Sequence, residues 1–78
     1  MDADDYIMLS LRLKNGLNLT TLKEKWGLII DSRTLRKLEI YKNQGFITME
    51  NGRVSLTAKG FLAENVIASD IMSGVEEV

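Results

Sequence analysis

A two-residue turn constrains the fold of this chain more than any other feature. Asn51 and Gly52 lie between two short runs, Phe46–Glu50 and Arg53–Leu56, whose residues are typical of β-strands. Both turn residues tolerate the positive φ that a tight hairpin requires, and Asn-Gly is the strongest short-range hairpin signal. The sequence therefore predicts a two-stranded antiparallel hairpin in the second half of the chain.

Helix signals flank this hairpin on both sides. Gly45 is a natural left-handed end for a preceding helix, and Thr57 can cap a following helix with its hydroxyl group. A helix, a short hairpin and another helix at this spacing are typical of a winged-helix domain. We therefore predict a mainly α fold with one β-hairpin, winged-helix-like, in the order helix–helix–helix–hairpin–helix. It forms a single domain over residues 1–78, ordered from about residue 4 to residue 72.

The first expected helix runs from Tyr6 to about Lys14, after an acidic N-terminus that can cap it. Apolar and polar residues alternate from Leu9 onwards, which is a strand period. The content of Met, Leu, Arg and Lys favours a helix instead, and the following Asn15-Gly16 supplies a stop. As a helix, the segment is apolar around most of its circumference. Two interpretations stay open: deep burial in the domain, or a second apolar face for another domain.

Caps and apolar spacing predict three further helices. They run from Asn18 to Gly27, from the Asp31-Ser32 cap to Gln44, and from Thr57 to Met72. Leu35 and Leu38 are expected to face inward from the third helix. Between the second and third helices, Leu28–Ile30 crosses the core as a connector of undefined local structure. The small, acidic segment Ser73–Val78 is expected to fray.

The chain contains neither His nor Cys. This excludes imidazole and thiolate metal sites and every Cys- or His-based nucleophile scheme. The carboxylates and lysines lie at termini, caps and exposed helix positions, without the pocket that perturbs a catalytic group. We therefore expect no catalytic, cofactor-binding or metal-binding residue and no autonomous enzyme. The longest apolar runs are too short for a membrane span, and the composition fits a cytoplasmic protein.

A DNA-binding transcriptional regulator is the alternative that the fold suggests. The third helix would be the recognition helix of a winged-helix domain, and it carries four basic residues and one acidic residue. The candidate nucleic-acid face comprises Arg33, Arg36, Lys37 and Arg53. A net charge of −1 and a pI of about 5.3 argue against this alternative, because neutralisation of phosphates dominates affinity for nucleic acid.

Nearly the whole chain, from about Asp4 to Met72, also resembles a known domain. The runs that carry the resemblance are Tyr6-Ile7-Met8-Leu9-Ser10-Leu11-Arg12-Leu13, Gly16-Leu17, Leu22 to Trp26-Gly27, Gly45-Phe46-Ile47, Asn51-Gly52-Arg53-Val54 and Leu56-Thr57-Ala58-Lys59-Gly60. The chain is similar to the C-terminal domain of the oxygen-independent coproporphyrinogen III oxidase family. The first of these runs looks closest to the oxidase-like, haem-chaperone branch of that family.

The resemblance implies an accessory domain of a larger radical S-adenosylmethionine protein. In that family of oxidoreductases a catalytic barrel precedes this domain and binds a [4Fe–4S] cluster through Cys-x-x-x-Cys-x-x-Cys. The chain has no such motif, so the cluster and S-adenosylmethionine are expected in a barrel outside these residues. Whether the parent is a true oxidase or a haem chaperone stays open.

The expected partner is that barrel. The candidate interface comprises Tyr6, Met8 and Arg12 on the first helix and Ile67 and Ile71 on the outer side of the last helix. Because such an interface would expose an apolar patch on the isolated chain, self-association at high concentration is also expected.

Overall fold

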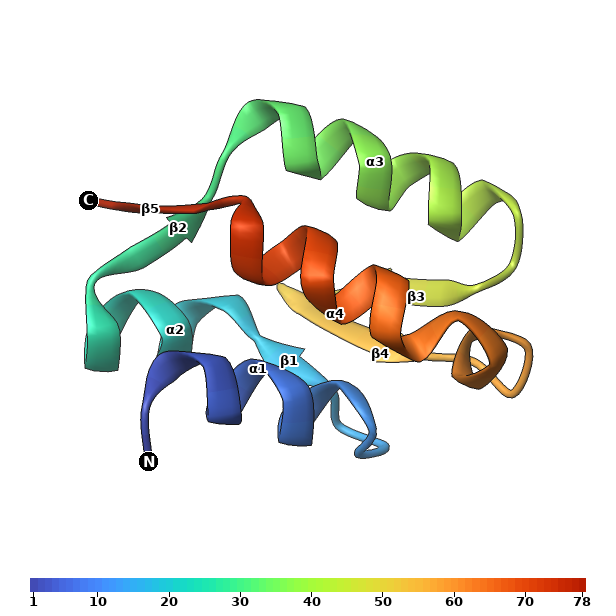
Figure 1. The fold of residues 1–78 in the computed structure, drawn as a ribbon, viewed down its shortest axis with the longest axis horizontal. Coiled ribbons are helices and arrows are strands. Elements are labelled where there is room, and N and C mark those ends of the chain that lie inside the picture. Colours follow the sequence, from blue (N-terminus) through green and yellow to red (C-terminus); the bar gives the residue numbers. More distant parts are fainter.

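A computed structural model describes residues 1–78 and confirms a mainly α fold with a β-hairpin (Figure 1). The elements are α1 (Ala3–Leu11), β1 (Leu17–Asn18), α2 (Leu19–Trp26), β2 (Leu28–Ile30), α3 (Ser32–Asn43), β3 (Ile47–Glu50), β4 (Arg53–Leu56), the 3-10 helix η1 (Gly60–Ala63), α4 (Glu64–Ser73) and β5 (Val75–Glu77). The hairpin β3–β4 therefore follows α3, as its turn residues predicted.

The hairpin belongs to a three-stranded antiparallel sheet with the order β1–β4–β3. Val54 pairs with Met49 of β3 on one side and with Leu17 of β1 on the other. Asn51 and Gly52 both have positive φ, 52° and 73°, as the turn requires. A short strand between the first two helices that joins the wing completes a winged-helix arrangement. Sequence reasoning missed β1 because two residues show no strand period.

The C-terminal segment does not fray, contrary to the prediction. Residues Val75–Glu77 form β5, which pairs antiparallel with the connector Leu28–Ile30, now β2 (Figure 1). The Asp31 N–H donates to the Gly74 carbonyl at 2.8 Å, just before β5 begins. A side chain at Gly74 would collide with Thr34 of α3, so glycine allows this close approach. Backbone pairing with β2 therefore orders the acidic C-terminal segment, and amino-acid composition does not indicate this pairing.

Side-chain caps set most helix starts. Asn18 accepts hydrogen bonds from the Thr20 and Thr21 N–H groups, and Asp31 accepts one from Thr34 N–H at 2.7 Å, as predicted. Gly27 ends α2 in the left-handed conformation.

The predicted bounds of two helices were wrong. Asp2 caps α1 by accepting the Asp5 N–H at 2.8 Å, so α1 begins earlier than expected, and it ends at Leu11. Thr57 accepts the Gly60 N–H at 3.0 Å, but this turn leads into η1. Helix α4 begins only at Glu64, because the capped turn continues as 3-10 structure first.

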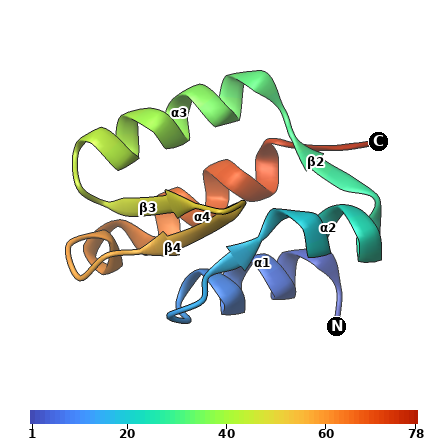
Figure 2. The same cartoon turned by 180° about the vertical axis from the view of Figure 1, so that it is seen from behind.

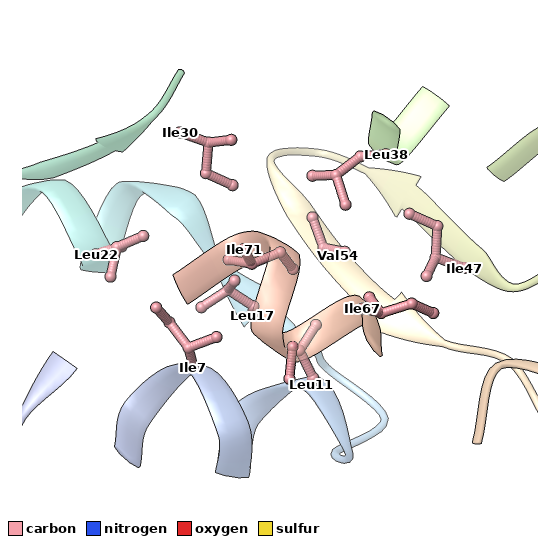
Figure 3. Packing of buried hydrophobic residues seen from close by; sticks show 11 residues of the cluster. Ile7, Leu11, Leu17, Leu22, Ile30, Leu38, Ile47, Val54, Ile67 and Ile71 are labelled. Atoms are coloured by element: carbon pink, nitrogen blue, oxygen red, sulfur yellow. The ribbon is translucent and has the colours of Figure 1, made fainter. Parts of the chain in front are cut away.

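Eleven buried apolar residues form one core between the helices and the hairpin (Figure 3). They are Ile7, Leu11, Leu17, Leu22, Ile30, Leu38, Ile47, Val54, Ile67, Ala68 and Ile71. Leu38 faces inward as predicted, whereas Leu35 is 39% exposed, contrary to the prediction. Thr34 takes the inward position one residue earlier because Gly74 leaves room for it.

Candidate docking surface

Helix α1 is apolar on two faces, and only one of them packs within this domain. Ile7 and Leu11 are buried in the core. Met8 and Leu9 are exposed on the other side of the helix, Leu9 at 52%, and Leu13 is exposed in the turn that follows. The apolar circumference of the sequence therefore divides into an inner face that builds the core and an outer face that remains in solvent.

A second group of exposed apolar side chains lies where η1 joins α4. Phe61, Leu62 and Val66 line a shallow hollow of about 300 Å³, and Leu62 is 89% exposed. Helix α1 packs against α4, and the two lie side by side in Figure 1. An ion pair links α1 to the start of α4, since Arg12 Nε lies 3.2 Å from Glu64 Oε1. The α1/η1 surface is defined by Met8, Leu9, Leu13, Phe61, Leu62 and Val66.

The predicted interface residues of α1 lie at or near this surface. Met8 belongs to it, and Arg12 is exposed beside it in the ion pair. Tyr6 is half-buried because its ring stacks on Trp26 of α2, with the ring centroids 4.9 Å apart. Trp26 thereby packs against the core, as predicted. Tyr6 thus serves the internal packing of α1 and α2 rather than the outer face.

Ile67 and Ile71 do not lie on the outer side of the last helix, and this prediction was wrong. Both are fully buried, and Figure 3 shows them in the centre of the core. Helical periodicity turns these two residues and Ala68 toward the core, so Val66 faces solvent instead. The pattern missed Leu62, whose exposure follows from the 3-10 turn that replaces the expected start of α4.

The structure places the candidate nucleic-acid residues in different surroundings. Arg33 and Arg36 are exposed on α3. Lys37 faces α4, where its Nζ lies 3.7 Å from Asp70 Oδ1. A positive charge that already has a carboxylate partner is less available for phosphate.

Arg53 lies on the wing among acidic residues. It lines a small hollow together with Glu39 and Lys42 of α3 and Glu50 of β3, so two carboxylates lie among the two cations. These carboxylates interrupt the positive charge between the recognition helix and the wing. The four basic residues therefore do not form the uninterrupted cationic face that a duplex requires.

Helices α3 and α4 are tied together by a polar contact at half-buried Tyr41. Its hydroxyl donates a hydrogen bond to Asp70 Oδ2 at 2.5 Å. This bond, together with partial burial and the Asp70 charge, raises the pKa of Tyr41 to about 12. The contact fixes the α3 side of α4.

The largest concave region lies on another side, between α2, β2 and α3. This apolar groove has a volume of about 660 Å³. Its lining residues are Leu19, Thr20, Leu22, Lys23, Glu24, Leu28, Ile29, Ile30 and Leu35. Sequence reasoning did not identify it. The three consecutive apolar residues of β2 could have indicated it. A strand that is buried on one face needs apolar residues only at alternate positions, so a continuous apolar run indicates a second apolar face.

The chemistry of this chain does not fit the family's iron–sulfur cluster. Such clusters are held by cysteine thiolates, and the chain has no Cys. No three acidic side chains gather in a geometry that could hold a metal ion. No helix of the structure is both long enough and apolar enough to cross a bilayer.

Comparison with known proteins identifies the family. A family model described as the HemN C-terminal domain matches residues 3–63, from the start of α1 to the end of η1. Searches of curated proteins and of solved structures gave no match. The matched residues include the run from Tyr6 to Leu13 and the whole hairpin, and they make up most of the chain. The chain therefore belongs to the family of HemN C-terminal domains, as its resemblance to the oxygen-independent coproporphyrinogen III oxidases predicted.

Proposed function

We propose that this chain is the accessory domain of an oxygen-independent coproporphyrinogen III oxidase-like protein and packs on the radical S-adenosylmethionine barrel of that protein. The observation that carries the proposal is the α1/η1 surface, which groups six of the eleven exposed large apolar side chains. Exposed apolar patches of this kind usually mark interaction sites on soluble proteins. Family membership supports the barrel as the partner.

The composition of the surface suits a protein interface. Its only ion pair, between Arg12 and Glu64, is already made within the domain. A partner that covers Arg12 would therefore not bury its charge unpaired, which is the costly event in protein association. Apolar side chains around a satisfied polar pair are the arrangement expected at the centre of such an interface.

The proposal places the parent protein in porphyrin metabolism in the cytoplasm. Its barrel would hold the [4Fe–4S] cluster and S-adenosylmethionine, and this domain would hold neither. The run Tyr6–Leu13 supports the oxidase-like, haem-chaperone branch by its resemblance to that branch. The interrupted charge of α3 and the wing gives no support to the DNA-binding alternative.

A binding experiment tests the proposal. The barrel of the HemN-like protein from the same organism would be produced separately and titrated with this chain by calorimetry. The variant Leu62→Lys places a charge in the α1/η1 surface and should weaken binding at least about tenfold, since burying an unpaired charge costs more than 1.4 kcal/mol. Ile40→Lys is the matched control, because Ile40 is also exposed but lies on α3.

Two results would contradict the proposal. One is a titration that shows no heat of binding and no complex with the barrel at about 100 μM, which would exclude even a weak docking interaction. The other is equal binding by the wild type and Leu62→Lys, which would move the interface away from the α1/η1 surface.

A further inference from the structure

Strand β2 has one paired edge and one unpaired edge. The Asp31 N–H donates to the Gly74 carbonyl at 2.8 Å, and the Val78 N–H donates to the Gly27 carbonyl at 2.9 Å. In an antiparallel ladder the backbone groups of alternate residues point to opposite edges. Residues 27, 29 and 31 therefore face β5, and the N–H and C=O groups of Leu28 and Ile30 face away from it. No other strand pairs with β2.

The unpaired edge borders the apolar groove. Leu28, Ile29 and Ile30 all line that groove. Side chains of consecutive strand residues point to opposite faces, so three in a row can line one hollow only along an edge. Figure 2 shows β2 in front of β5, between α2 and α3. Leu19 and Leu35 supply the apolar walls from these two helices.

We propose that this edge pairs with β2 of a second copy of the chain. The two copies would form an antiparallel four-stranded sheet in the order β5–β2–β2–β5 across a twofold axis at Ile29. In this register Leu28 lies opposite Ile30 of the second copy, and Ile30 lies opposite Leu28. These are the two residues whose backbone groups point outward, so each pair exchanges its N–H and C=O groups.

The strand and its groove argue for a second copy over an unrelated strand. Strand β2 is three residues long and lies between the left-handed Gly27 and the helix cap Asp31. In the proposed register each residue of β2 therefore has a partner residue in β2 of the second copy. Ile29, which is 38% exposed, would pack against its own counterpart. The groove also contains one cation and one carboxylate, Lys23 and Glu24, so two copies would bring no net charge into the shared interface.

The test is the association state of the chain as a function of concentration. Sedimentation equilibrium from about 10 μM to 1 mM covers the range of a weak interface, and the wild type should form dimers within it. Ile29→Lys places two like charges on the twofold axis and should raise the dimer dissociation constant at least about tenfold. Ile40→Lys, at an exposed site on α3 outside the groove, should leave this constant unchanged.

The variant Leu62→Lys tests whether the copies associate through the α1/η1 surface instead of through the groove. If Leu62→Lys abolishes the dimer and Ile29→Lys does not, copies associate through the α1/η1 surface and the proposal is wrong. A chain that is monomeric up to 1 mM also overturns it.

Amide hydrogen exchange on the wild type gives a second readout that needs no variant. The amides of Leu28 and Ile30 should become protected as the concentration rises, because they face the second copy. The Ile29 amide faces β5 and should be protected at every concentration. Exchange of Leu28 and Ile30 that does not change with concentration would contradict β2 pairing.

Discussion

Helices α1 and α3 flank the same core and differ in what they present to solvent. Each buries one face, through Ile7 and Leu11 in α1 and through Thr34 and Leu38 in α3. The outer surface of α3 exposes Leu35 and Ile40 among five charged residues, whereas the exposed Met8 and Leu9 of α1 are followed by exposed Leu13 in the next turn. In a winged-helix domain α3 would be the recognition helix. Here the proposed docking surface lies on α1 rather than on α3, so the proposal does not rest on the helix that the fold would use for DNA.

The largest expected effect compares the two faces of α1. Leu11→Ala should lower the free energy of unfolding by about 2–5 kcal/mol, because it leaves a cavity in the core. Leu9→Ala, two residues away and half exposed, should lower it by less than about 1 kcal/mol. Urea unfolding of the isolated chain measures both. Similar losses for the two variants would show that the outer face of α1 packs within this domain.

An intermediate effect tests how α3 is attached. Tyr41→Phe removes the hydrogen bond to Asp70 and should lower the free energy of unfolding by about 1–2 kcal/mol. Lys37→Met removes only the long, half-exposed ion pair to the same carboxylate, so its loss should stay below about 1 kcal/mol. The reverse order would show that charge, rather than the tyrosine hydroxyl, holds α3 against α4.

The Tyr41 contact also has a defined pH dependence. The pKa of Tyr41 is raised from 10.0 to about 12, so the folded state holds the phenolic proton more tightly than the unfolded state does. The stabilisation is complete below pH 10 and is lost as the pH rises toward about 12. The stability difference between the wild type and Tyr41→Phe should therefore be constant near neutral pH and shrink above pH 10. A difference that persists unchanged at pH 12 would contradict this account.

Local signals predicted local structure. Asn51-Gly52 predicted the hairpin because both residues suit positive φ, and Asn18 and Asp31 predicted helix starts because their side chains accept backbone N–H groups. These interactions join residues close in sequence, so a short window contains all the information.

Packing and long-range pairing were not predictable in this way. Residues from Phe61 to Met72 are apolar over a broad arc, so the sequence does not tell which of them face the core, and Ile67 and Ile71 were placed on the wrong side. Strand β5 forms because β2, more than forty residues earlier, offers backbone partners to an acidic tail. The apolar groove is also a tertiary feature, because its walls come from α2, β2 and α3.

The smallest effect concerns the start of α3. Asp31 accepts the Thr34 N–H, which lowers the pKa of its carboxyl group below the usual 3.8. The charged cap therefore stabilises the fold above that pH, and its contribution is lost as the pH falls below it. Asp31→Asn keeps a capping oxygen that does not titrate, so the variant should lose less stability than the wild type on acidification. Parallel losses in both proteins, measured by urea unfolding at low pH, would contradict a role for the charge.

The central claim is that α1 and η1 carry a docking surface that the rest of the domain does not cover. The most direct measurement is side-chain methyl NMR with a soluble paramagnetic agent, for this chain alone and bound to the barrel of a HemN-like protein. The methyl signals of Met8, Leu9 and Leu62 should be strongly attenuated in the free chain and protected in the complex, while Ile40 stays attenuated in both. Protection of Ile40 with continued attenuation of Leu9 and Leu62 would contradict the claim, because it would place the partner on α3.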